Sequence, residues 1–192
     1  MTNSRVGNWV IIGIVIVNIL LWFIFPPEPN WTEDPKDVGH MIGELFSSTA
    51  MILMGLAITL ATKPRWLEGY FGGLDKMYRT HRRIAMLAFL LLIAHVIVIP
   101  RSGVGGIGAI LGRVAMFGIV VMVLLTIAPR VPLISDVIRL SYDKWRLGHK
   151  LLGVFFIMGL FHYRFSEAYV LDSVPGFYLF AFVALGVGAY LY

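Results

Sequence analysis

The chain has 192 residues, of which 58% are hydrophobic and only 14% are charged, and its formal net charge is +5. Soluble domains are usually about 45–50% apolar and about 25% charged, so water is not the main solvent of this protein's surface. The absence of cysteine excludes disulfides, iron–sulfur clusters and every metal centre that is bound through a Cys thiolate.

Six apolar stretches are long enough to cross a bilayer, which requires roughly 20 helical residues for a hydrocarbon core of roughly 30 Å. In chain order they are Trp9–Phe25, Val38–Thr62, His81–Ile99, Gly106–Ala128, Leu147–Phe165 and Val174–Tyr192. Proline ends most of them, because it cannot continue the helical hydrogen-bond ladder: Pro26, Pro64, Pro100 and Pro129 each follow a stretch. The sequence therefore predicts an all-α membrane protein, a transmembrane bundle of six helices.

The distribution of Lys and Arg predicts the orientation of these spans. Six spans place both termini and the segments 62–83 and 129–150 on one side, which holds twelve of the 16 Lys and Arg residues. The other side holds only Lys36, Arg101, Arg113 and Arg164. Because cytoplasmic loops carry the excess of positive charge, we expect cytoplasmic termini and an external segment Glu28–Asp37. The charge is thus a topology signal in a bilayer protein, expected in a bacterial inner membrane, and does not indicate a nucleic-acid partner.

Four of the five histidines lie in two of the predicted spans. His81 opens the third span and His95 follows 14 residues later, whereas His149 opens the fifth span and His162 follows 13 residues later. Both spans run from inside to outside, so the two levels lie about 20 Å apart along the helices. Neutral imidazole binds a metal without bringing charge into lipid, and haem iron in electron-transfer proteins takes two axial ligands. The pairs His81–His149 and His95–His162 therefore predict two b-type haems.

The angular positions of these histidines fit a straight helix only in part. At about 3.6 residues per turn, a residue 14 positions later lies within about 40° of the starting face of the helix. A residue 13 positions later lies about 140° around the helix from it. The second pair therefore requires tilt, irregular winding at Gly153 or Gly159, or a non-helical start at His149. The spacing does not decide between these possibilities.

Glycine spacing marks a further feature of the fourth span. Gly108 and Gly112 have the small-xxx-small spacing that lets two helices approach closely. The same glycines would also suit a flexible outer loop, and the sequence leaves both possibilities open.

Two segments around the paired histidines resemble the ferric reductase-like transmembrane domain, which ferric reductases, NADPH oxidases and their bacterial relatives share. The first segment comprises residues 73–83 and extends through His95. The second comprises residues 142–150 and extends through His162. The resemblance covers essentially the whole chain, 1–192, as a single haem domain. It implies haem b in the membrane and electrons supplied from NAD(P)H through FAD. We expect this flavin on a missing domain or a cytoplasmic flavoprotein, and an electron acceptor outside.

The resemblance also implies roles for individual residues. The first histidine of each span corresponds to a ligand of the inner haem, and the second to a ligand of the outer haem. Phe155 lies midway along the fifth span, where relatives place an aromatic between the haems; the alternative is an ordinary packing role. Apart from the resemblance, Arg82 or Arg83 beside His81 would bind a haem propionate through its guanidinium group, or both are ordinary cytoplasmic charge. Ile99 stands where oxygen-reducing relatives often have another histidine, which argues against a dedicated oxidase.

Two other functions stay open. A single-haem subunit that delivers electrons for periplasmic methionine sulfoxide reduction has a similar length, but usually lacks the histidine that is His81 here. A proton channel or small transporter would use His40 and Glu44, which lie four residues apart on one helix face. The alternative for these two side chains is a local hydrogen bond between helices, with Ser47 or Ser48 as a candidate partner.

Overall fold

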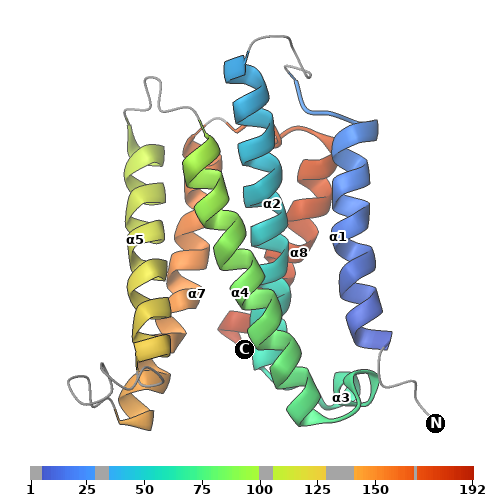
Figure 1. Ribbon diagram of the computed structural model, residues 1–192, viewed down its shortest axis with the longest axis vertical. Coiled ribbons are helices and arrows are strands. Elements are labelled where there is room, and N and C mark those ends of the chain that lie inside the picture. The colour runs from blue at the N-terminus through green and yellow to red at the C-terminus, as the bar shows by residue number, and fades with distance from the viewer. Residues whose placement is uncertain (1–5, 29–34, 100–105, 129–140, 167) are drawn as a thin grey trace. The chain divides into compact units, whose positions relative to one another are not determined.

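The protein is built from helices in every part that the structure describes. The computed structural model describes residues 6–28, 35–99, 106–128, 141–166 and 168–192, and all the regular elements in these ranges are helices (Figure 1). They are α1 (Val6–Ile24), α2 (Pro35–Ala61), α3 (Arg65–Phe71), α4 (Leu74–Val98), α5 (Ile107–Ile127), α7 (Tyr142–Phe165) and α8 (Val174–Leu191). The predicted all-α class is confirmed.

Within the described residues, five helices are long and apolar enough to cross a membrane: α1, α2 from Asp37 onward, α4, α5 and α8. They coincide with five of the six predicted spans, as expected for an integral, multi-pass membrane protein. The remaining span corresponds to α7, which has 24 residues but is not among the five. Its histidines and charged residues, such as Lys150 and Arg164, reduce its apolar character. That α7 also crosses the membrane, which would make six spans, stays a prediction.

Two helices begin five or more residues earlier than the sequence predicts. α4 begins at Leu74 instead of His81, and α7 begins at Tyr142 instead of Leu147. Hydropathy locates only the apolar part of a helix, and the first turns of α4 and α7 are polar and charged. Because α7 is helical through His149, the non-helical start considered for that residue is wrong.

The short helix α3, between α2 and α4, is not predicted by hydropathy. It follows Pro64 and ends at Gly72, whose φ of 75° lies in the left-handed region that favours glycine. Gly73 follows with a φ of 110°, and the N–H of Leu74 then donates to the Glu68 carboxylate at 3.2 Å. Two successive glycines thus allow the tight turn that joins α3 to α4.

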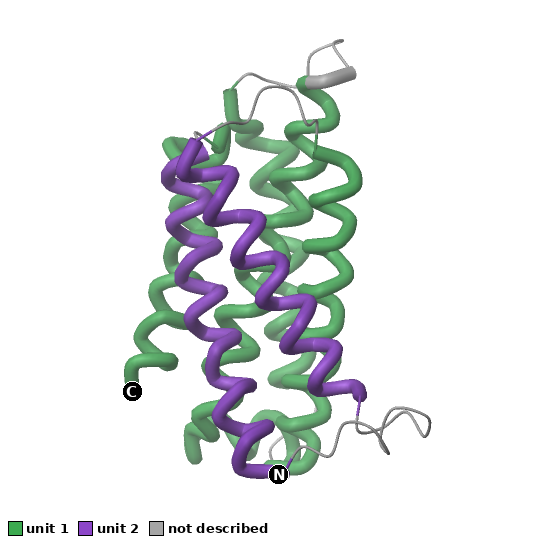
Figure 2. The backbone as a smooth tube through the Cα atoms, turned by 90° about the vertical axis from the view of Figure 1, so that its left-hand side faces the viewer, with its two compact units in different colours: residues 1–102, 167–192 green, residues 103–166 purple. Residues whose placement is uncertain are grey.

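The helices form two compact units (Figure 2). The first comprises residues 1–102 and 167–192, with α1, α2, α3, α4 and α8; the second comprises residues 103–166, with α5 and α7. In the first unit α2 is central, because 67% of its apolar 18-residue segment is buried, whereas only 11% of the corresponding segment of α4 is buried. The core of this unit contains Ile11, Ala50, Leu53, Ala57, Leu60, Phe71, Met77, Ile84 and Ala88.

Polar contacts attach α1 to its neighbours inside the first unit. Asn18 is fully buried and donates from Nδ2 to Thr49 Oγ1 on α2 at 3.0 Å. The hydroxyl of Tyr178 on α8 donates to the carbonyl of Ile14 at 3.0 Å. Hydrogen bonds between membrane helices contribute on average only about 0.6 kcal/mol, so these contacts mainly specify which faces of the helices meet.

In the second unit α5 and α7 run antiparallel and side by side (Figures 1 and 2). A Cβ at Gly108 would lie 2.6 Å from the carbonyl carbon of Phe165, and a Cβ at Gly118 would overlap the ring of Phe155. Of the two possibilities that the spacing of Gly108 and Gly112 left open, the structure shows close helix packing. Both glycines lie within α5 and not in a loop.

Part of the predicted topology lies outside the described residues. This applies to residues 29–34 of the predicted external segment, to Arg101, and to residues 129–140, which include Arg130 and Arg139. The charge distribution across the membrane therefore stays a prediction from the sequence.

Candidate functional site

Two histidines of α4 are held by backbone carbonyl groups of α2. His81 Nδ1 lies 2.8 Å from the carbonyl oxygen of Ala57, and His95 Nδ1 lies 2.9 Å from that of Gly43. Gly43 and Ala57 are fourteen residues apart along α2, as are His81 and His95 along α4. One antiparallel register of α2 against α4 therefore provides both acceptors.

These contacts decide which nitrogen of each ring can bind a metal. A carbonyl oxygen only accepts, so the bonded Nδ1 carries the proton, and Nε2 of the neutral imidazole carries the lone pair. Metal-binding histidines usually donate their other ring N–H to a carbonyl or carboxylate, which fixes both the tautomer and the ring orientation. His81 and His95 have this arrangement.

His162 of α7 has the same arrangement within the second unit. Its Nδ1 lies 2.8 Å from the carbonyl oxygen of Gly108 on α5. The ring also lies against Gly112, where an added Cβ would come within 2.8 Å of Cε1 and Nδ1. The two small residues of α5 thus permit a close helix contact and make room for the imidazole at the same time.

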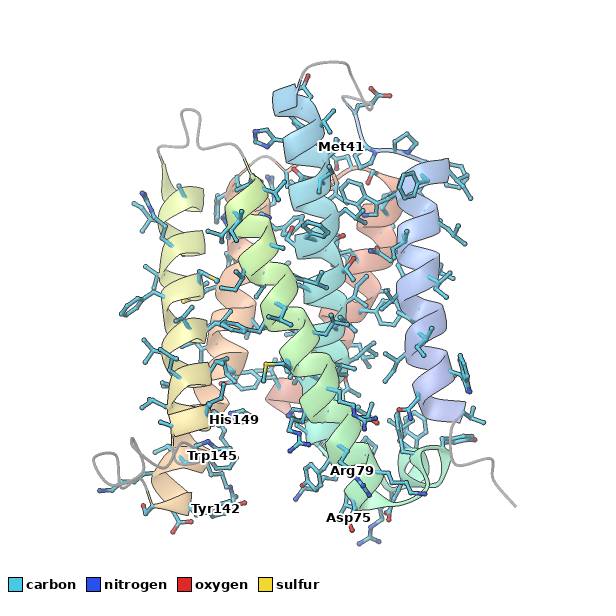
Figure 3. All side chains as sticks on the ribbon, viewed as in Figure 1. Met41, Asp75, Arg79, Tyr142, Trp145 and His149 are labelled. Atoms are coloured by element: carbon cyan, nitrogen blue, oxygen red, sulfur yellow. The ribbon has the colours of Figure 1, made fainter. Side chains whose placement is uncertain are left out.

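His149 of α7 is held by an aromatic neighbour. The ring of Trp145, one turn earlier, stacks on the imidazole with centroids 5.1 Å apart and planes inclined by 26° (Figure 3). Trp145 in turn donates from Nε1 to Thr126 Oγ1 on α5 at 3.3 Å. All four paired histidines are half-buried, and each is oriented by a group on a defined helix.

The four histidines occupy equivalent positions along their two helices. His81 lies seven residues after the first residue of α4, and His149 seven residues after the first residue of α7. His95 and His162 each lie three residues before the last residue of the same helices. His81 and His95 thus lie at two levels of one helix in the first unit, and His149 and His162 at two levels of one helix in the second.

This donor set fits the axial positions of a haem. The porphyrin supplies four donors to iron, so the protein contributes at most two, and neutral imidazole is a common choice. The described residues contain no group of three or more His, Cys, Asp or Glu side chains that could hold a bare metal ion. The fit rests on the three imidazoles whose Nδ1 is bonded to a carbonyl, because in that tautomer Nε2 carries the lone pair that could bind iron.

The other predicted site residues have different surroundings. Phe155 is half-buried, and its ring packs against Gly118 of α5. Arg82 and Arg83 are exposed on α4, directly after His81. The contact with Gly118 shows that Phe155 has a packing role. The roles of Phe155, Arg82 and Arg83 towards a haem stay predictions.

Glu44 links α2 to the segment that precedes α8. Its buried carboxylate accepts the N–H of Tyr169 at 2.9 Å and the N–H of Val170 at 3.0 Å. The ring of His40, one turn earlier, lies 5.6 Å from the ring of Tyr169. Ser47 Oγ donates to the backbone carbonyl of Glu44. These contacts support the local, helix-linking role of Glu44 and His40 over a proton relay.

The same surroundings raise the pKa of the Tyr169 phenol above its usual value. Burial contributes most, followed by the negative charges of Asp37 and Glu44. The phenol therefore stays protonated, and so neutral, over the whole range around neutral pH.

Replacing Glu44 should destabilise the protein through the loss of two hydrogen bonds. Glu44→Ala leaves two backbone N–H groups without their acceptor, at about 1–3 kcal/mol for each buried group. Glu44→Gln keeps one acceptor oxygen and should lose roughly half as much. Thermal unfolding of the purified protein in detergent measures both differences.

Glu68→Ala is the matched control for this prediction. The Glu68 carboxylate also accepts a backbone N–H, from Leu74, but at an exposed turn where water can replace it. This variant should lower the unfolding midpoint less than Glu44→Gln does. Equal midpoints for the unsubstituted protein, Glu44→Gln and Glu44→Ala would show that the carboxylate does not anchor the segment before α8.

The sequence predicts the four histidines as candidate ligands, but it does not predict the groups that hold them. The acceptors are backbone carbonyls of Gly43, Ala57 and Gly108, which have no side-chain signature. Small residues at these positions are a signal, but a weak one in a chain with 20 glycines. Trp145 could have been found from the sequence, because it is an aromatic residue one turn before a candidate ligand.

Comparison with protein families places these helices in a known group. Residues 46–160 match the family described as ferric reductase like transmembrane component. The match runs from α2 into α7 and includes His81, His95 and His149, with His162 two residues beyond it. A comparison with curated proteins finds no match. The match covers more than half of the chain and agrees with the resemblance seen around the histidines, so the chain belongs to the ferric reductase-like transmembrane family.

Proposed function

We propose that this chain transfers electrons across the membrane by means of two b-type haems, each bound by one histidine of α4 and one of α7. Membership of the ferric reductase-like family implies a membrane oxidoreductase. The observation that carries the haem proposal is the Nδ1–carbonyl contact of His81, His95 and His162, at 2.8, 2.9 and 2.8 Å. This bond places the lone pair of the ring on Nε2, the atom that would bind iron, and increases the basicity of the ligand.

The equivalent positions of the histidines along α4 and α7 support the pairing. His81 and His149 follow the starts of their helices by the same number of residues and are proposed to bind the inner haem. His95 and His162 precede the ends by the same number and are proposed to bind the outer haem. Equal depths require α4 and α7 to cross the membrane in the same direction. With α7 as the fifth of six spans, both termini would lie in the cytoplasm.

Each haem would supply a one-electron carrier. The chain's own residues bind and orient it: the imidazoles occupy the axial positions, and the apolar helices exclude water. Arg82 and Arg83 lie at the inner level on α4 and would bind propionates through charge-assisted hydrogen bonds. Phe155 lies between the two levels on α7 and would separate the two haems.

The proposed electron donor is a reduced flavin on a cytoplasmic domain or partner protein. Haem accepts one electron at a time whereas a nicotinamide gives a hydride, so a flavin has to stand between them. Exposed Lys144, Arg146 and Lys150 at the start of α7 would attract an acidic flavoprotein surface. The proposed acceptor lies outside and is a ferric chelate, dioxygen or a periplasmic protein.

The visible absorption spectrum of the purified chain tests this function. We expect the bands of low-spin, bis-imidazole haem in both oxidation states, and close to two haems per chain. One haem per chain would support the subunit that serves a periplasmic reductase. A colourless protein would support the channel or transporter and would contradict the proposal.

A further inference from the structure

The imidazole of His149 is fixed by a series of contacts that begins on α5. The hydroxyl of Thr126 donates to the carbonyl of Met122 at 2.8 Å and accepts from Trp145 Nε1 at 3.3 Å. The indole of Trp145 then stacks on the imidazole, with centroids 5.1 Å apart and planes inclined by 26°. The position of the indole is therefore set from the facing helix, and the indole passes that constraint on to His149.

A second aromatic ring lies on the other side of the indole along α7. The ring of Tyr142 is 5.6 Å from that of Trp145, with planes inclined by 36°. Figure 3 shows Tyr142, Trp145 and His149 following one another along the first turns of the helix. Tyr142 is exposed, whereas Trp145 and His149 are half-buried. The indole is thus held between a surface ring and the candidate ligand.

This stack restricts the rotation of the His149 ring about its second side-chain torsion. The second side-chain torsion of histidine is broad, so the ring plane is set by what surrounds it. In His81, His95 and His162, an Nδ1–carbonyl contact sets the plane. For His149, the flat face of the Trp145 indole at stacking distance does so.

We infer that Trp145 is a positioning residue that sets the plane of the His149 imidazole and thereby the ligand field of the inner haem. The inference rests on the proposed function. In a low-spin haem with two imidazole ligands, the angle between the ligand planes determines how the iron d orbitals split. That angle has a spectroscopic signature, the g values of the ferric iron in electron paramagnetic resonance, which is independent of any catalytic rate. Trp145 acts only through His149 and does not touch the iron.

Three substitutions separate the parts of this arrangement. Trp145→Leu removes the flat ring, Trp145→Phe keeps a flat ring but removes the N–H, and Thr126→Val removes the acceptor while leaving both rings. Trp66→Leu is the matched control, because Trp66 is 72% exposed on α3 in the other unit. For each protein we would measure haem content, the g values of the ferric form, and the rate of haem transfer to an excess of apomyoglobin.

Trp145→Leu should shift one of the two low-spin signals and leave the other unchanged. It should also speed the loss of one haem by about three- to tenfold, the range expected for the loss of an aromatic pair. Trp145→Phe and Thr126→Val should shift the same signal by a smaller amount, and Trp66→Leu should shift neither. The two conservative variants keep the test decisive if Trp145→Leu does not fold.

The outcomes distinguish this inference from the proposed function. Two haems per chain, with g values and transfer rates unchanged in the Trp145 and Thr126 variants, would overturn the inference and leave the proposed function standing. Lower thermal stability without any shift of a signal would mean that Trp145 has only a packing role, which also overturns it. An unsubstituted chain that binds no haem would overturn both.

Discussion

Replacing any one of the four paired histidines by alanine is expected to remove one haem and leave the other. His81→Ala and His149→Ala should remove the inner haem, and His95→Ala and His162→Ala the outer one. The physical reason is that the haem which loses its ligand would keep a single axial imidazole and could not remain low-spin and six-coordinate. Haem content and the low-spin absorption bands of each purified variant measure the effect.

His40→Ala is the control for this series. His40 also lies in a candidate membrane span, α2, but its ring lies against Tyr169 and is outside the proposed pairs. This variant should keep two haems. A haem content that stays at two in all four paired variants, or that falls in His40→Ala, would contradict the assignment. A content near one that is unaffected by His81→Ala would favour the single-haem subunit.

Gly108→Ala is expected to have the next largest effect, although it adds only one methyl group. The new Cβ would lie 2.6 Å from the carbonyl carbon of Phe165 and 2.8 Å from the backbone nitrogen of Ser166. These are backbone atoms that cannot rotate away, so α5 and α7 must separate locally. The carbonyl of Gly108 would then move away from His162 Nδ1, which it meets at 2.8 Å. We expect lower thermal stability and loss of the outer haem.

In this variant, the higher helix propensity of alanine stabilises the protein whereas the packing clash destabilises it, and the packing effect should be the larger one. Alanine favours a helix over glycine by about 0.8–1 kcal/mol, whereas overpacking costs about 1–3 kcal/mol. Gly13→Ala in α1 isolates the first effect, because a Cβ at Gly13 meets no atom within 4 Å. The control should keep or raise the unfolding midpoint. A Gly108→Ala protein that matches it in both midpoint and haem content would show that this close contact is absent.

The apolar helices are well predicted from the sequence because their own residues determine them. The span expected at Gly106–Ala128 is observed as Ile107–Ile127, and the span expected at Val174–Tyr192 is observed as Val174–Leu191. The first turns of α4 and α7 are missed, because polar residues can extend a helix beyond the hydrocarbon core without any hydropathy signal. α3 is missed because a seven-residue helix is too short to show one.

The candidate ligands are predictable, but the contacts around them are not. The histidines are rare polar residues in apolar stretches, so their spacing is visible in the sequence. Their acceptors are carbonyl groups, which every residue possesses, so only the tertiary register selects Gly43, Ala57 and Gly108. The partners of Glu44 are likewise backbone amides more than 120 residues away in sequence.

The equal spacing of the two histidines on α4 and their two carbonyl acceptors on α2 has a consequence for assembly. Sliding α2 along α4 by one residue, about 1.5 Å, would remove both acceptors at once, and no intermediate register satisfies only one. The two imidazoles of α4 are therefore ordered together. If the two haems are bound as proposed, a haem at either level would stabilise the register that the other level requires, and the loading of the two levels would be cooperative. No side-chain substitution deletes a main-chain acceptor, so this coupling tolerates mutation better than one built from side chains.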